Sequence, residues 1–391
     1  MPSEQAISLL VERLKEPDAY ESSMQELIAL GSSAVPALID ALTNSSQALS
    51  VRLGAASALG EIRDERAIVP LISVFNLTTQ GGEPQDYYII PALVRFGVLA
   101  LPHLVPVLTD PKRDVLTRAA AARALGNLGE PLVLEVLVER LKDANESIPV
   151  RSSAASALGE LGERGAVAPL MDILSQETDE LLRQRAVIAL GKLGDQRAVE
   201  LLIKVLQMDQ SIVVRLAVPR ALGLIGDERV IAPLIEAVTQ EKVTFEVHEA
   251  LEQFGTPALQ AVLAALETTH DKPLARGTLV RTLGYFEQEE AFTRLLTILE
   301  DEHEASSVRT AAALALGLQQ DYRASKPLLA LLESHKDLLL RSACAVALGI
   351  LADPETLPVL QKLLRDEPET TPWEKQLKKA IETAIKRINL R

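Results

Sequence analysis

Small and apolar residues recur along this chain in one phrase, of which VRSSAASALGELG, residues 150–162, is a clear copy. Counted from Gly159, its apolar positions −9, −5, −2, −1 and +2 are Val150, Ala154, Ala157, Leu158 and Leu161. At about 100° per residue these positions share one face of a helix. The pattern therefore predicts an amphipathic helix that buries this face.

The glycine that closes the phrase recurs from one end of the chain to the other. It falls at Gly31, Gly60, Gly97, Gly126, Gly159, Gly191, Gly223, Gly255, Gly284, Gly317 and Gly349. The spacings run from 29 to 37 residues and are mostly 32 or 33. A period held over this many copies predicts a solenoid, in which each unit buries its apolar face against its neighbours.

Each unit divides into two helical segments. In the unit that closes at Gly191, Val167, Leu170, Ile173 and Leu174 follow helical spacing, polar residues 175–179 interrupt it, and a second helix begins near Leu181. We therefore expect an all-α fold: one continuous α-solenoid over residues 1–391, a HEAT-like superhelix of about eleven to twelve antiparallel helix pairs.

An arginine lies eight residues before the closing glycine in most units. These residues are Arg52, Arg118, Arg151, Arg183, Arg215, Arg276, Arg309 and Arg341. We expect a structural ladder in which each guanidinium bonds loop carbonyls or an acidic loop residue of a neighbouring unit. A row that binds anions is the alternative. Three units carry Ser23, Ile89 and Val247 at this count.

The repeated pattern also points to a family. Segments 225–234 (IGDERVIAPL) and 193–199 (LGDQRAV), read with the Val-Arg-x-x-Ala-Ala-x-Ala-Leu-Gly phrase, resemble the HEAT-like repeats of phycobilisome (phycobiliprotein) lyases. The resemblance covers nearly the whole chain. It implies an α-solenoid, but it leaves function open, because the same repeat serves bilin lyases, assembly factors and scaffolds.

Two segments depart from the repeat. Residues 76–88 contain Gly81-Gly82-Glu83-Pro84 and predict a protruding insertion loop that ends in Tyr87 and Tyr88. Residues 372–391 predict a C-terminal capping helix, since Thr371-Pro372-Trp373-Glu374 reads as a capping box with proline at the first helical position. This helix carries six Lys or Arg and two Asp or Glu. We expect it to shield the last core, with Trp373 packed against it.

Composition removes several function classes. The 391 residues carry a net charge of −14, which disfavours a nucleic-acid partner, because such binding draws its affinity from Lys and Arg. One cysteine, Cys344, allows no disulfide within the chain and no cysteine-rich metal site. We find no secretory signal and no apolar run of about 18 residues. These features predict a cytoplasmic protein without a membrane span.

No catalytic constellation is evident. The pair His248-Glu249 lies where the HEAT-like enzyme deoxyhypusine hydroxylase holds iron, but the neighbouring units offer Leu216-Ala217 and Gly277-Thr278. One pair cannot supply a di-iron ligand set. We therefore predict no metal, no catalytic residue and no cofactor, and we expect Cys344 to be a buried, inert thiol.

Positions −7, −3 and +1 of the second helix point away from the predicted core, and several are apolar. Exposed apolar runs mark binding surfaces; cover by curvature or by the terminal helix is the alternative. The candidate partner-binding residues are Tyr87, Tyr88, Ile90, Val94, Val98, Leu216, Leu224, His248, Glu252, Arg281 and Tyr285.

We therefore favour a protein-binding scaffold or assembly factor that uses its concave face. From the family resemblance, its partner would be a phycobiliprotein or another component of phycobilisome or photosystem biogenesis. The alternative is an enzyme: a bilin lyase or lyase-isomerase that attaches a tetrapyrrole to a phycobiliprotein cysteine. The attacking cysteine would then belong to the acceptor, and bilin would be the bound cofactor.

Overall fold

A computed structural model describes residues 3–75, 86–240 and 245–390. Over these ranges the chain forms twenty-four α-helices, short 3-10 turns and no strand. The helices alternate as first and second members of twelve pairs. The predicted all-α solenoid of eleven to twelve helix pairs is confirmed.

Contacts divide the chain into an N-terminal unit, Met1–Leu201, and a C-terminal unit, Leu202–Arg391, with α13 (Val199–Met208) at the division. The helices of the N-terminal unit are α1 (Glu4–Glu12), α2 (Pro17–Ala29), α3 (Val35–Thr43), α4 (Leu49–Ile62), α5 (Ile68–Ser73), α6 (Asp86–Val94), α7 (Leu101–Thr109), α8 (Val115–Leu128), α9 (Leu134–Lys142), α10 (Ile148–Leu161), α11 (Val167–Gln176) and α12 (Glu180–Leu193).

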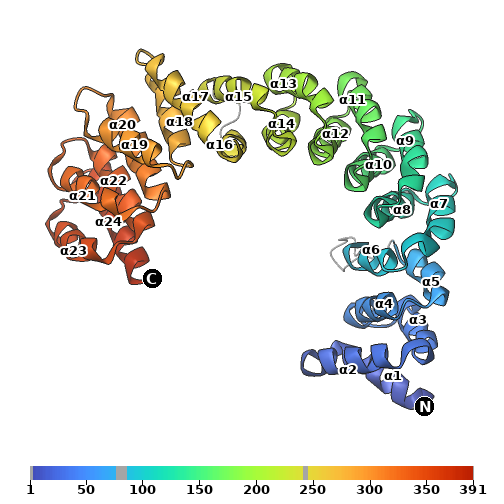
Figure 1. Cartoon of the computed structure of the whole chain (residues 1–391). Coiled ribbons are helices and arrows are strands. Elements are labelled where there is room, and N and C mark those ends of the chain that lie inside the picture. Colours follow the sequence, from blue (N-terminus) through green and yellow to red (C-terminus); the bar gives the residue numbers. More distant parts are fainter. Residues whose placement is uncertain (1–2, 76–85, 241–244, 391) are drawn as a thin grey trace. The chain divides into compact units, whose positions relative to one another are not determined.

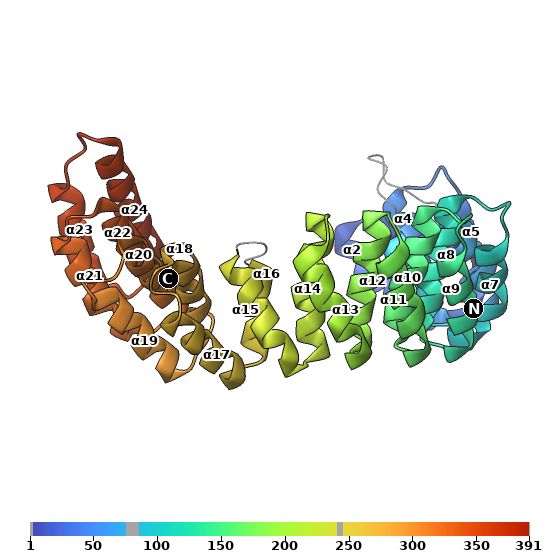
Figure 2. The same cartoon turned by 90° about the horizontal axis from the view of Figure 1, so that it is seen from above.

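Those of the C-terminal unit are α14 (Ile212–Ile225), α15 (Ile231–Thr239), α16 (Phe245–Gln253), α17 (Thr256–Glu267), α18 (Pro273–Leu283), α19 (Glu289–Glu300), α20 (Ser306–Leu318), α21 (Ser325–Ser334), α22 (Leu338–Leu351), α23 (Leu357–Asp366) and α24 (Pro372–Asn389). Within each unit, odd-numbered helices form one layer and even-numbered helices the other (Figures 1 and 2).

The apolar stripe of each second helix forms the core, as the periodicity predicts. Val150, Ala154, Ala157 and Leu158 of α10 are at most 1% exposed, and Leu161 is 8% exposed. Neighbouring second helices approach closely because the closing glycine lacks a side chain. A Cβ added at Gly126 would lie 2.5 Å from Cα of Ala157 in the next second helix.

This close approach repeats along both units. The glycines that meet an alanine of the next second helix in this way are Gly60, Gly126, Gly159, Gly284, Gly317 and Gly349. Three residues later the chain turns through a positive φ, at Arg63, Gly129, Gly162, Gly194, Gly226, Gln320 and Ala352. Except in the unit that closes at Gly284, each regular unit thus has a left-handed turn position three residues after its closing glycine.

The three units without the ladder arginine need a different alignment. Gly31, Gly97 and Gly255 have φ of +55° to +57°, and a Cβ added to any of them meets nothing within 4 Å. They are turn glycines, so the packing positions of these units are Ile28, Val94 and Glu252. The sequence alignment therefore misplaced these units by three residues.

The correction changes which residues face the core. Ser23, Ile89 and Val247, predicted to replace the ladder arginine, are 0% exposed and lie at core position −5 of the corrected count. In the unit that ends at Gly97, the residue at the arginine position is Asp86.

The two departures from the repeat are only partly as expected. Residues 76–85 of the predicted loop lie outside the described residues, whereas 86–88 form the first turn of α6 rather than a loop. The capping box at Thr371 and Glu374 is present and opens α24, which buries Leu377 and Ile381. Trp373 is 53% exposed, so the expectation that it packs against the core is wrong.

No single described helix is long and apolar enough to cross a membrane; only the pair Asp86–Val94 and Gly97–Thr109, bent by 120°, meets the length and composition test together.

Candidate functional site: the layer of second helices

The ladder arginines join consecutive units. Arg151 donates from Nε to the carbonyl oxygen of Leu141 at 3.0 Å, in its own unit, and its Nη1 lies 2.8 Å from Glu177 in the next inter-helix loop. Arg341 repeats this geometry with Leu332 and Glu367. These donors are engaged by protein acceptors inside the solenoid, which is the arrangement of a structural tie.

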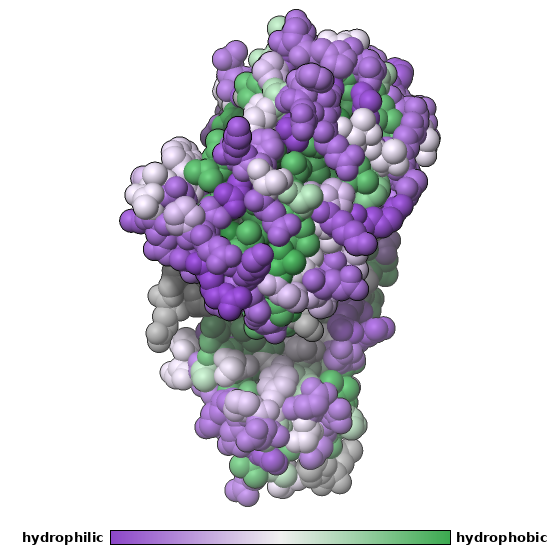
Figure 3. All heavy atoms as spheres, turned by 90° about the vertical axis from the view of Figure 1, so that its left-hand side faces the viewer, coloured by the Kyte–Doolittle hydropathy of each residue, from purple (hydrophilic) through white to green (hydrophobic). Residues whose placement is uncertain are grey.

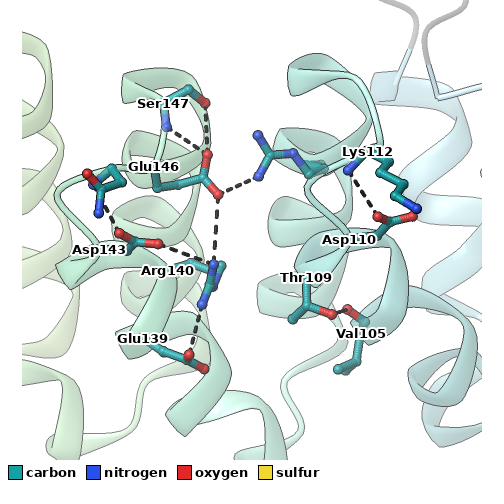
Figure 4. A network of polar contacts seen from close by, with 11 residues as sticks. Val105, Thr109, Asp110, Lys112, Glu139, Arg140, Asp143, Glu146 and Ser147 are labelled. Atoms are coloured by element: carbon teal, nitrogen blue, oxygen red, sulfur yellow. Dashed lines mark hydrogen bonds and ion pairs between the residues drawn. The ribbon is translucent and has the colours of Figure 1, made fainter.

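Other members of the row vary the acceptor. Arg276 bonds Leu266 and Glu304, Arg309 bonds Leu299 and His335, Arg52 bonds Leu42, and Arg215 bonds Asp209. Arg118 pairs with Glu146, which also lies 4.0 Å from Arg140, and Arg140 in turn pairs with Asp143 (Figure 4). Arg183 lies at the same position in α12 and also has an interaction partner.

Two of the candidate contact residues are buried. Ile90 and His248 are each 5% exposed, so the prediction that they face a partner is wrong. Both were counted as position −7, which points outward. In the corrected alignment they occupy position −4, where regular units place buried residues such as Ala155.

The structure leaves the other candidates at the surface or partly covered. Tyr87, Tyr88, Val98, Leu224, Glu252 and Arg281 are exposed, whereas Val94, Leu216 and Tyr285 are half-buried. Tyr87, Tyr88 and Val94 lie on α6, Val98 follows it, and the rest belong to the C-terminal unit. The candidates therefore divide between the two units.

His248 is part of a packed cluster on α16 and α18. Its ring stacks on Tyr285, with centroids 4.9 Å apart and planes at 22°, and Nδ1 lies 3.1 Å from Oγ1 of Thr282. Burial, with a smaller contribution from the charge of Arg281, lowers the pKa of His248 to about 4. The imidazole is therefore neutral at pH 7. No group of three or more metal-ligating side chains occurs among the described residues.

A groove crosses the even-numbered layer of the N-terminal unit over α8, α10 and α12. Its volume is about 380 Å³. Leu116, Pro149 and Leu181, from the first turns of these helices, are apolar lining residues, and Arg123, Arg185 and Lys192 are the cationic ones. Ser152, Ser153 and Ser156 of α10 also line the groove. Ser156 leaves space in the groove, because the equivalent residues of α8 and α12 are the longer Arg123 and Ile188.

The polar groups of this groove are unequally satisfied. Arg123 pairs with Asp86 and donates to Oγ of Ser153 at 2.9 Å. Lys192 pairs with Glu160. Two lining groups remain: Arg185 makes no ion pair with any residue that the structure describes, and the buried Oγ of Ser152 has no hydrogen-bond partner there.

A family profile described as HEAT repeats matches residues 101–186, 167–253 and 295–372, more than half of the chain. The chain belongs to the HEAT-repeat family. A second profile, the PBS lyase HEAT-like repeat, matches residues 51–76. Both agree with the family that the sequence pattern predicts. No curated protein matches the chain by sequence.

Solved structures share this HEAT architecture at low identity. Kap95p, in a complex with RanGDP, aligns over 99% of this chain and 61% of its own, with 14% identity and a TM-score of 0.60. Yeast importin-β (Kap95p) gives the same coverage and identity, with a TM-score of 0.58. The chain thus spans about three fifths of these solenoids. The CpcE–CpcF complex of phycocyanin lyase from Nostoc gives 20% identity, 72% and 93% coverage and a TM-score of 0.32.

Exposed large hydrophobic side chains are concentrated on one layer of the HEAT pairs. Of twenty such residues in the described ranges, twelve lie on even-numbered helices, three on odd-numbered ones and four on the 3-10 turns that lead into odd-numbered helices. The helix lengths, 157 against 115 residues, do not account for this ratio. On the side of the C-terminal unit seen in Figure 3, hydrophobic patches lie between hydrophilic side chains.

Sequence reasoning missed the groove for an identifiable reason. Ser152 and Ser156 look unremarkable in a single repeat, and only comparison with the flanking helices reveals a hollow. The apolar lining residues lie at position −10, which is on the same face as −3, two helical turns earlier. Leu116, Leu181, Val213, Leu274 and Leu339 occupy this position in five units and are all exposed. Their recurrence is visible in the sequence and could have indicated the surface.

Proposed function

We propose that this HEAT-repeat chain is a non-catalytic scaffold that binds another protein through its layer of second helices. The observation that carries the proposal is the uneven distribution of exposed hydrophobic side chains, twelve on even-numbered against three on odd-numbered helices. Single exposed apolar residues are ordinary, but their concentration on one layer is typical of an interaction surface.

The state of the reactive side chains supports a role without catalysis. Burial raises the pKa of the Cys344 thiol to about 12, which leaves it protonated and inert. His248 is neutral at pH 7, and its ring packs between a tyrosine and a threonine. Neither group is placed as an exposed nucleophile or base.

The match of residues 51–76 to the PBS lyase HEAT-like repeat supports a more specific proposal for the partner. We expect a phycobiliprotein or another component of phycobilisome or photosystem assembly, met in the cytoplasm. The repeat is short and serves several functions, so the partner must be found by capture.

The test compares partner binding by the layer of second helices and the layer of first helices within the N-terminal unit. Full-length chain is immobilised, exposed to lysate of its source organism, and the retained proteins are identified by mass spectrometry. Leu116→Asp changes a second helix, and Val69→Asp is its control on a first helix; the two native side chains are 55% and 58% exposed. We expect a partner that Leu116→Asp loses and Val69→Asp keeps. Equal loss in both variants, or retention of bilin without any protein, would exclude the scaffold.

The same family match favours a second candidate, a bilin lyase or lyase-isomerase. Its test is to mix the chain with phycocyanobilin and an apo-phycobiliprotein and record absorbance. A spectral shift with a covalent adduct on the acceptor would establish the enzyme, whereas an unchanged spectrum without an adduct would exclude it.

A further inference from the structure

The groove over α10 combines three kinds of surface within about 380 Å³. Leu116 and Leu181 of its lining are 55% and 41% exposed. Covering such apolar side chains with a partner removes them from water and so contributes favourably to the free energy of binding. The volume falls within the range of about 300–1,000 Å³ that is usual for binding pockets. It is large enough for a few side chains and too small for a folded domain.

The charge of the groove is opposite to that of the chain. The lining contains Arg123, Arg185, Lys192 and one acidic residue, Glu160. The whole chain carries −14. Arg123 and Lys192 have acidic partners, so Arg185 is the lining cation that no described residue neutralises. One guanidinium without an ion pair matches one carboxylate, which it can bind through two hydrogen bonds.

Ser152 supplies a second, independent observation. The residue lines the groove and is 6% exposed, yet its Oγ has no hydrogen-bond partner among the described residues. Buried hydroxyls are nearly always hydrogen-bonded, because a buried polar group without a partner has lost its bonds to water and gained none in return. A ligand with an acceptor oxygen would satisfy this donor.

We propose that the groove over α10 holds an Asp or Glu side chain of the protein partner, with its carboxylate on Arg185 and Ser152 and an adjacent aliphatic residue against Leu116 and Leu181. The inference rests on the proposed scaffold function and names the chemistry of its partner. A carboxylate fits better than a phosphate dianion, since only one lining cation lacks an ion pair and Glu160 would repel a second negative charge.

The probe for this site is a displayed library of random dodecapeptides, selected on the full-length chain. Peptides with an acidic residue beside an aliphatic one should be enriched. Their binding should fall at least about tenfold on Arg185→Ala, because a charge-assisted hydrogen bond contributes about 1.5–3 kcal/mol. Arg220→Ala is the matched control, since Arg220 is an exposed arginine on a second helix and is not among the lining residues of the groove. Ser156→Leu, which fills the groove without changing charge, should also abolish binding.

Ser152→Ala separates a ligand contact from a structural role. Removal of an unmet buried hydroxyl should leave the free protein equally or more stable, while the selected peptides bind more weakly. If Ser152 had a purely structural role, Ser152→Ala would lower the stability of the free protein and the binding of the peptides together. Failure to enrich peptides, enrichment without acidic residues, or equal binding to Arg185→Ala would overturn the proposal. So would competition by inorganic phosphate but not by the free acidic peptide.

The outcome for the scaffold function remains separate. If the captured partner is retained by both Arg185→Ala and Ser156→Leu, the groove assignment fails and the scaffold stands. If no protein is captured by the native chain, the scaffold fails.

Discussion

The sequence alignment gives Gly126 and Gly97 the same place in the repeated phrase, but the structure gives them different positions and opposite roles. Gly126 is buried, and Ala157 of the next second helix lies so close to its backbone that no Cβ would fit between them. Gly97 has open space where a side chain would be, and is required for its φ of +56°. The first glycine brings helices together, whereas the second allows a turn.

This difference explains the character of the irregular units. Their packing position holds Ile28, Val94 or Glu252, so a side chain stands where regular units have none. The contact of α8 with α10 is correspondingly the most extensive between two helices, and that of α6 with α8 is smaller. Arg123 spans the latter contact through its ion pair with Asp86. A missing glycine is therefore accompanied by looser packing and by individual side-chain bridges.

The largest effect should come from the ladder arginine that only regular units have. In Arg276→Ala, Glu304, whose side chain is 12% exposed in the native protein, loses its partner, and the carbonyl oxygen of Leu266 loses its donor. Breaking such a buried pair should lower the free energy of unfolding by about 3–5 kcal/mol. Urea denaturation followed by far-UV circular dichroism measures it. An exposed pair is the control: Arg66→Ala should change stability little, and a loss as large as that of Arg276→Ala would contradict the argument.

The second-largest loss of stability should come from substituting the packing glycine. Gly126→Ala forces a Cβ to within 2.5 Å of the Ala157 backbone, and the overpacking should cost about 3 kcal/mol. Gly97→Ala, by contrast, meets no atom and should cost only about 1 kcal/mol of backbone strain. Both are read from urea midpoints at constant m-value. Equal losses in the two variants would remove the distinction between packing and turn glycines.

The buried His248 should make the stability of an irregular repeat unit depend on pH. Its folded-state pKa of about 4 lies below the usual 6.5, so the unfolded chain binds the proton more readily. The protein should therefore lose about 2–3 kcal/mol of stability as pH falls from 6.5 to 4 and keep it above 6.5. His248→Gln should flatten this part of the pH profile of urea midpoints. A profile that the substitution leaves unchanged would assign the dependence to other groups.

The smallest effect has the opposite sign. Ala352 occupies the left-handed turn position of a regular unit with φ of +53°, where most units have glycine. Ala352→Gly should raise the free energy of unfolding by about 1 kcal/mol by relieving this strain. Thermal unfolding by calorimetry would detect it, and Gly129→Ala should shift the melting temperature the other way.

Much of the architecture was readable in the sequence. The period near 32 residues, the apolar stripe of Val150, Ala154 and Leu158, and the capping box at Thr371 follow from local rules of helix geometry and capping. These rules act within one helix or recur with each unit, so a single sequence displays them.

Other features needed the folded chain. The sequence does not distinguish a glycine at a packing position from a glycine at a turn position. This ambiguity caused the three-residue error in the alignment, which led to the wrong prediction that Ile90 and His248 are exposed. The groove over α10 likewise depends on Ser156 lying level with the longer side chains of Arg123 on α8 and Ile188 on α12. The sequence determined the repeat and its buried stripe, because both are set by spacing along one helix. Only tertiary structure decided which glycines pack, which side chains are covered and where the surface is hollow, because those properties belong to contacts between units.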